Sequence, residues 1–173
     1  MAIALAALEN DIINFNITFD KEKIHNLLLE AQNIAKDELD LDNIFYNERF
    51  IELFMSEKLG HEYGNATQGG DAFETDINMP TEYKAINLRN KTGKGSFQFH
   101  WLSESKISKY KETANMYFAV RDGVTIKEIY KVPTKKVSPY LDKKATGSKS
   151  INGHTSFSVD KLIDELGAER IQI

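Results

Sequence analysis

The chain has 173 residues, of which 41% are hydrophobic and 28% are charged, and its formal net charge is −4. That length suits one domain with a sizeable core, and the composition is ordinary for a globular protein. The sequence contains no cysteine, which excludes disulfides and thiolate metal sites and is compatible with the cytosol. Any metal would therefore be bound by oxygen or histidine ligands.

The charges are distributed unevenly along the chain. Residues 1–62 carry thirteen acids against five bases, whereas residues 84–111 carry seven bases against one acid. A second basic stretch, residues 131–149, has six bases against Asp142 alone. This arrangement suits a protein that contacts phosphates on one side, although a solvated lysine-rich face would produce the same pattern.

The first eight residues are apolar, but no basic residue precedes them and the apolar run stops at Glu9. The run is too short for an export signal or for a membrane span. We expect a helix there, whose apolar face packs either against a second subunit or against its own domain.

Two further helices are predicted in the first sixty residues. Apolar residues recur at helical spacing over residues 21–37, with Asp20 placed to cap the N-terminus. A helix over residues 48–59 should begin after Asn47 and end at Gly60.

Beyond residue 60 the period of the hydrophobic pattern shortens from 3.6 to 2, which favours strands. The clearest local signal is Asp122-Gly123, a two-residue turn between two β-rich runs that predicts an antiparallel hairpin. The other expected elements are strands over 81–88 and 170–173, short helices over 103–110 and 159–166, a short helix or turn over 133–140, and polar loops over 89–95 and 142–152. We predict an α+β (mixed α/β) fold in one domain, residues 1–173, which is mainly helical over residues 1–60.

The strongest chemical signal lies in residues 69–84. Asp71 follows a Gly-Gly pair, and Glu82 and Lys84 stand two positions apart on an expected strand, so that both project from one face. A hairpin through residues 78–80 would bring Asp71 beside them. Two carboxylates suit a hard divalent cation, and a lysine can orient or deprotonate a water beside it. Such a constellation cleaves phosphodiesters.

The Asp/Glu-x-Lys triplet alone is a weak signal in a charged chain. It recurs at residues 104–106 and 142–144, where no Gly-flanked Asp precedes it on a strand-like run. A same-face ion pair between Glu82 and Lys84 is therefore the alternative interpretation of the triplet.

The run from Gly69 through Asp71 to Glu82-Tyr83-Lys84 resembles the metal site of the PD-(D/E)XK nucleases, and within them the PvuII-type restriction endonucleases. The similarity extends from about residue 43 to residue 167. It continues through Ser108-Lys109-Tyr110, the hairpin over residues 118–123 with Ile129-Tyr130, and Ile151-Asn152-Gly153. The resemblance implies a restriction-endonuclease-like fold, with a central mixed sheet flanked by helices and with N-terminal helices that form a dimer.

The resemblance also implies catalytic roles. Asp71 and Glu82 would bind Mg²⁺ together with the backbone carbonyl of Tyr83, and Lys84 would lie beside the attacking water. Tyr110 would face a phosphate near the cleaved bond. Gln68 stands where the family has an acid near the metals, which favours one metal over two.

Residues 96–101 match a family ribbon that enters the major groove, although only His100 matches a family histidine. Gln98, His100 and Trp101 are the candidate base readers, because Gln can pair with adenine and His can donate to guanine. Phe97 and Phe99 are expected in the core instead.

Further DNA contacts are expected elsewhere in the chain. Lys91 and Lys94 lie in a Gly- and Lys-rich loop that can approach a phosphate, and His154 is a third candidate. Asn152 matches an asparagine that reads a base edge in the family. Asn47 falls where the family approaches the minor groove, but a role as a helix cap would suffice.

Together these features predict a Mg²⁺-dependent type II restriction endonuclease, a homodimer that cuts double-stranded DNA at a short palindrome and leaves 5′-phosphate ends. The resemblance further implies a prokaryotic cytoplasmic protein whose functional partner is a cognate DNA methyltransferase, with no role for a membrane. The alternatives are a non-palindromic or nicking nuclease of the same superfamily, a catalytically silent DNA-binding protein on that scaffold, and an unrelated α+β domain with an incidental ion pair.

Overall fold

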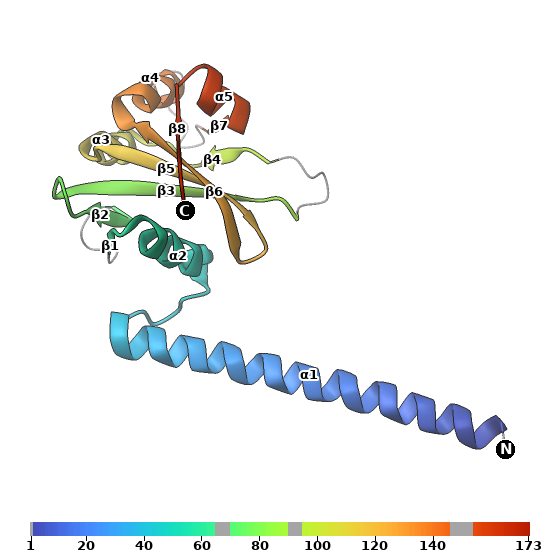
Figure 1. Cartoon of the computed structure of the whole chain (residues 1–173). Helices are drawn as coiled ribbons and strands as arrows, with labels where there is room; N and C mark the ends of the chain where they lie inside the picture. The colour runs from blue at the N-terminus through green and yellow to red at the C-terminus, as the bar shows by residue number, and fades with distance from the viewer. Residues whose placement is uncertain (1, 65–69, 90–94, 146–153) are drawn as a thin grey trace. The chain divides into compact units, whose positions relative to one another are not determined.

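The computed structural model describes residues 2–64, 70–89, 95–145 and 154–173. The chain divides into two compact units, residues 1–49 and residues 50–173. Each unit has its own secondary structure, and the order of the elements can be followed in Figure 1.

The N-terminal unit is dominated by one helix, α1 (Ala2–Leu39). The predicted start of a second helix after Asp20 is wrong, because the helix passes through that position without a break. No Gly or Pro occurs before Gly60, so no residue in this stretch interrupts the helical backbone. The helix ends where Asp40 adopts a left-handed conformation (φ +53°) and the amide of Leu41 donates to the carbonyl of Ala35.

The chain after α1 folds back onto the last turns of the same helix. The Gln32 side chain donates to the carbonyl of Leu41 and accepts from the amide of Ile44, both at 2.9 Å. A short 3-10 turn, η1 (Tyr46–Glu48), follows. Asn47 lies inside this turn with φ +51° and ψ +30°, whereas a residue that caps the N-terminus of a helix has an extended backbone, so the prediction that Asn47 caps the next helix is wrong. That helix, α2 (Arg49–Leu59), begins two residues later.

The second unit is built on a six-stranded sheet in the order β1-β2-β3-β5-β6-β8. Its strands are β1 (Glu62–Tyr63), β2 (Ala72–Glu74), β3 (Met79–Asn87), β5 (Asn115–Asp122), β6 (Thr125–Pro133) and β8 (Glu169–Ile171). The central pair β3 and β5 is parallel, and the other pairs are antiparallel. This mixed sheet, flanked by helices, confirms the predicted fold class (Figure 1).

Helix α2 covers one face of the sheet, where Ile51 and Met55 pack with Tyr83 and Tyr117. The other face is covered by α3 (Glu104–Glu112), α4 (Thr134–Ala145), α5 (Val159–Asp164) and a two-stranded ribbon of β4 (Phe97–Phe99) and β7 (Thr155–Phe157). Successive residues of a strand point to opposite faces. Accordingly Phe118 packs under the ribbon while its neighbour Tyr117 packs under α2.

Most of the short local predictions are confirmed. The β5–β6 hairpin forms, but Asp122 pairs with Thr125, so the two-residue loop is Gly123-Val124, one position later than expected. Gly123 has φ +62°, a left-handed conformation that glycine adopts without strain. Ser103 caps α3 as predicted, since its hydroxyl accepts from the amide of Lys106. The loop predicted from residue 142 is helical as far as Ala145. In the part of the chain that the structure describes, no helix has the length and apolar character needed to cross a membrane.

Candidate active site

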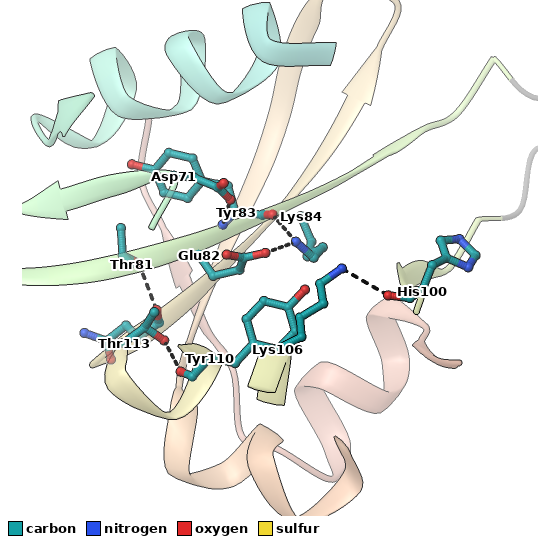
Figure 2. A network of polar contacts seen from close by, with 10 residues as sticks. Asp71, Thr81, Glu82, Tyr83, Lys84, His100, Lys106, Tyr110 and Thr113 are labelled. Atoms are coloured by element: carbon teal, nitrogen blue, oxygen red, sulfur yellow. Dashed lines mark hydrogen bonds and ion pairs between the residues drawn. The ribbon is translucent and has the colours of Figure 1, made fainter. Parts of the chain in front are cut away.

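The hairpin of β2 and β3 brings together the three residues that the sequence singled out. The amide of Asp71, just before β2, donates to the carbonyl of Thr81 at 3.0 Å. The Asp71 carboxylate accepts from the amide of Tyr83 at 2.7 Å. Glu82 and Lys84 flank Tyr83 on β3 and point to the face covered by α3 and the ribbon, as Figure 2 shows. Asp71, Glu82 and Lys84 therefore meet at the end of this hairpin.

Lys84 is held by two contacts within its own strand. Its ammonium group donates to the Glu82 carboxylate and, at 2.9 Å, to the backbone carbonyl of Tyr83. The side chains of Lys84 and Glu82 are only 19% and 13% exposed. The Glu82–Lys84 ion pair of the alternative interpretation is thus present. A second carboxylate, Asp71, lies beside it, and a simple ion pair would have no need of this carboxylate.

Burial raises the pKa of Asp71 well above its usual range, and the nearby Glu82 charge raises it further, while Lys84 opposes both. Burial alone would lower the pKa of Lys84, but the carboxylates of Glu82 and Asp71 raise it above the ordinary lysine value. Lys84 is accordingly an ammonium ion. Two carboxylates with one lysine leave the site short of positive charge.

The oxygen atoms at this site fit a divalent cation. Carboxylates and backbone carbonyls are the ligands that Mg²⁺ and Ca²⁺ prefer, and Asp71, Glu82 and the Tyr83 carbonyl supply both kinds. Among the described residues, no group of three or more His, Cys, Asp or Glu side chains is arranged to hold a metal. A cation here would therefore depend on the backbone oxygen and on water for its remaining ligands.

Two aromatic rings wall the site. The ammonium of Lys84 lies 5.4 Å from the centre of the Phe99 ring and 5.7 Å from that of Tyr110. Both distances are within the range of a cation–π contact. Tyr110 is buried on α3 beside Glu82, and this burial raises the pKa of its hydroxyl. Tyr110, which by the family resemblance would face a phosphate, therefore lies next to the carboxylates as a neutral hydrogen-bond donor.

Lys106 is a further side chain at the site, which the sequence analysis did not identify as functional. It lies on α3 one turn before Tyr110, and its ammonium is 5.8 Å from the centre of that ring and donates to the carbonyl of His100 at 3.0 Å. Burial and the nearby Lys84 charge lower the pKa of Lys106. The spacing of four between Lys106 and Tyr110 was the available signal, because residues at i and i+4 share a helix face.

The ribbon separates its core residues from its exposed ones as predicted. Phe97 and Phe99 are fully buried, while Gln98 between them is exposed. Gln98 lies directly opposite Ser156 of β7, which is also exposed. Ser156 was missed because only the strand register shows that it stands beside Gln98.

The remaining DNA-contact candidates have different outcomes. His100 and Trp101 follow β4, and both are exposed, Trp101 to 65%. His154 is exposed just before β7, and Asn47 belongs to the N-terminal unit rather than to the unit that holds the site. Four candidate site residues lie outside the described residues, namely Gln68, Lys91, Lys94 and Asn152.

The opposite face of the hairpin is held by a separate polar cluster. The hydroxyl of Tyr83 lies 2.8 Å from Nδ1 of His61, next to α2. Burial lowers the pKa of His61, although Glu74 opposes the shift, so the ring is neutral at ordinary pH. Glu74 itself accepts hydrogen bonds from Asn115 and Tyr117 on β5. These contacts fix β2 and β3 to the centre of the sheet and thereby fix the carboxylates on the other side.

A central mixed sheet, flanked by helices and carrying a β2–β3 hairpin of this kind, is the restriction-endonuclease-like fold, a scaffold of DNA-cutting hydrolases. The family model of restriction endonuclease PvuII matches residues 18–156. The chain belongs to this family, whose members are type II site-specific deoxyribonucleases, and its substrate is DNA. Enzymes of this kind typically need a divalent metal. No curated protein matches the chain.

Proposed function

We propose that the chain is a Mg²⁺-dependent type II restriction endonuclease that cuts both strands of duplex DNA at a short palindromic site and leaves 5′-phosphate ends. The observation that carries this proposal is the meeting of Asp71, Glu82 and Lys84 with the carbonyl of Tyr83 on one face of β3. Family membership supports the activity, and the site supports the chemistry.

Asp71, Glu82 and the Tyr83 carbonyl would hold the cation. Once bound, Mg²⁺ would supply a water of lowered pKa and neutralise negative charge on the phosphate. Lys84, fixed as an ammonium by its two acceptors, orients the attacking water and stabilises the charge that grows on the phosphate oxygens. Tyr110 donates a hydrogen bond to a phosphate oxygen beside the cut. The water oxygen bonds to phosphorus as the bond from phosphorus to the 3′ oxygen breaks, so the phosphate stays on the 5′ end.

We assign base recognition to the ribbon. A two-stranded β-ribbon fits the major groove, and Gln98 and Ser156 form the outward-facing pair at its centre. A glutamine can bond both N6 and N7 of adenine, and a serine beside it can bond a neighbouring base. His100 and Trp101 extend this surface beyond the end of β4. Lys91, Lys94, Asn152 and His154 are proposed as further contacts, and Asn47 as a minor-groove contact.

A palindrome has two equal halves, so a symmetric homodimer would place one active site on each strand. Helix α1 offers apolar side chains for this contact. Ile24, Leu27, Leu28 and Ile34 are 46–57% exposed although they are large and apolar. Burying them against a second copy would remove them from water. Sedimentation of the full chain at micromolar concentration should give a dimer, and a monomer at that concentration would contradict the proposal.

The biological setting follows from the activity. A restriction endonuclease would cut the DNA of its own cell unless that DNA were modified. We therefore propose a prokaryotic cytoplasmic enzyme that is paired with a cognate DNA methyltransferase in function, without a physical complex.

The site is tested with Asp71→Asn and Glu82→Gln, which remove a charge without changing the shape of the side chain. The wild-type chain should cut a mixed-sequence plasmid into discrete bands with Mg²⁺. Each variant should cut on the order of 10³-fold more slowly, because it loses an interaction needed in the transition state. Both variants should still bind DNA in a gel shift with Ca²⁺.

The matched control is Asp76→Asn, an exposed acid in the β2–β3 turn, which should cut like the wild type. If Glu82→Gln cut at the wild-type rate, the assignment of the site would be wrong. A smear in place of bands would indicate a nuclease without a strict site, and no Mg²⁺-dependent cutting at all would indicate a silent DNA-binding protein.

A further inference from the structure

A second ammonium group, that of Lys106, lies close to Lys84 at the candidate active site. Lys84 comes from β3 and Lys106 from α3, and their ammonium groups lie 5.7 and 5.8 Å from the centre of the same Tyr110 ring. Figure 2 shows the amine of Lys106 reaching past this ring toward the gap between Lys84 and His100. The two lysines therefore frame the place where a phosphate beside Tyr110 would lie.

The contacts of Lys106 do not explain its position by themselves. An ammonium group carries three N–H donors, and the carbonyl of His100 accepts from one of them. Across the described ranges, which break at 65–69, 90–94 and 146–153, no carboxylate lies within ion-pair distance of Lys106. The Glu82 carboxylate is paired with Lys84 instead. The charges of Glu82 and Asp71 act on Lys106 from nearby, but among the described residues no carboxylate accepts a hydrogen bond from its ammonium, so two N–H donors can turn to an anionic oxygen of a ligand.

A phosphodiester is an anion of suitable charge for this gap. Its non-bridging oxygens carry one negative charge in the ground state and a second as the water attacks. Each cation that touches those oxygens stabilises the transition state more than the ground state. No proton needs to pass through Lys106: the attacking water releases its proton to solvent, and the 3′ oxygen, which leaves with the electron pair of the broken bond, takes up a proton from solvent.

We propose that Lys106 is a further catalytic residue of this endonuclease, whose ammonium contacts a non-bridging oxygen of the scissile phosphate next to Lys84. This inference rests on the function proposed above. The carbonyl of His100 holds the ammonium in place from the end of the ribbon. Since His100 follows β4, the same contact connects the base-reading ribbon to the phosphate that is cut.

The experiment compares Lys106→Met and Lys106→Arg with Lys127→Met in the full chain. Lys127 is exposed on β6 and outside both basic stretches, so its variant makes the same change of charge elsewhere. DNA binding is measured in Ca²⁺ over a range of salt, and single-turnover cleavage is measured in Mg²⁺ on a fragment with a site mapped by the wild-type enzyme.

Lys106→Met should cut about 10²-fold more slowly, as expected when one interaction with the transition state is removed. Its plot of log binding constant against log salt should be shallower by about 0.9, because the variant neutralises one phosphate fewer. Lys106→Arg keeps the charge and should keep the wild-type slope. Lys127→Met should match the wild type in both measurements. A purely structural role for Lys106 would not change the salt slope.

The inference is overturned if Lys106→Met cuts at the rate of Lys127→Met, or if its salt slope equals that of the wild type. Thermal unfolding verifies that each variant is folded, and Lys106→Gln serves as the neutral variant if the methionine variant does not fold. A wild-type chain that cuts no DNA would contradict the proposed function itself. An active wild type with an unaffected Lys106→Met would contradict only the role of Lys106.

Discussion

Glu74 lies three residues after Asp71 and ties the active-site hairpin to the sheet. Its side chain is 2% exposed, and its carboxylate accepts from the side-chain amide (Nδ2) of Asn115 at 2.8 and 3.0 Å and from the hydroxyl of Tyr117 at 3.0 Å. The ammonium of Lys131 lies 3.4 Å away. These donors come from β5 and β6, so the cluster joins three strands.

Glu74→Gln tests this role without changing the volume of the side chain. A carboxylate offers two acceptor oxygens, whereas an amide offers one, so its nitrogen must face at least one of the donors. The variant loses at least one charge-assisted hydrogen bond and weakens the others, and each bond to a charged group contributes roughly 1.5–3 kcal/mol. We expect the free energy of unfolding to fall by about 3 kcal/mol, a large share of the roughly 5–15 kcal/mol of a typical domain.

Urea denaturation followed by circular dichroism measures this loss. Asp76→Asn, in the exposed turn between the same two strands, is the control and should stay within about 0.5 kcal/mol of the wild type. A loss in unfolding free energy below about 1 kcal/mol for Glu74→Gln would refute the reasoning, because replacing a buried carboxylate that has these donors should cost more than that. Cleavage should decline together with stability, since Asp71 is positioned by the same hairpin.

Two further predictions concern the site and the ribbon. The pKa of Asp71 is raised, so the folded chain binds a proton at this carboxylate more tightly than the unfolded chain does. The protonated Asp71 therefore contributes stability at low pH, and this contribution is lost as the pH rises above the usual Asp range. Without divalent cations, Asp71→Asn should therefore melt at a higher temperature than the wild type at pH 8, with the difference shrinking toward pH 4; a lower melting temperature at pH 8 would contradict this. Gln98→Ala should relax the preference at one base pair of the site by about 1–3 kcal/mol, measured as cleavage of single-base variants of the site, and unchanged selectivity would remove Gln98 from recognition.

The features that the sequence predicted correctly are those with a short-range physical cause. Gly60 ends α2 because its left-handed backbone suits glycine, and Ser103 starts α3 because its hydroxyl replaces a missing backbone acceptor. Glu82 and Lys84 were correctly expected on one face of a strand, because residues two positions apart in a strand point to the same side. The hairpin that brings Asp71 to them was predicted through residues 78–80, which is wrong in position: its turn spans residues 75–78, and β3 already begins at Met79.

The features that escaped prediction depend on partners distant in sequence. Ser156 stands beside Gln98 only because β7 pairs with β4 in one particular register. The parallel pairing of β3 with β5 and the approach of Lys106 to the carboxylates likewise follow from packing between elements. Asn47 is a case in which a local preference misled: asparagine favours the N-cap of a helix, but here it adopts a left-handed conformation inside a 3-10 turn.

Trp101 is the one tryptophan of the chain, and it stands 65% exposed just past the ribbon, on a backbone with φ +57°. Excitation at the red edge of the absorption band selects tryptophan over tyrosine. The fluorescence of the protein then comes from one indole, which is exposed to solvent. A duplex that covered this indole would shift the emission to shorter wavelength or quench it. If DNA covers Trp101 as proposed above, this indole reports binding without a dye or an added label.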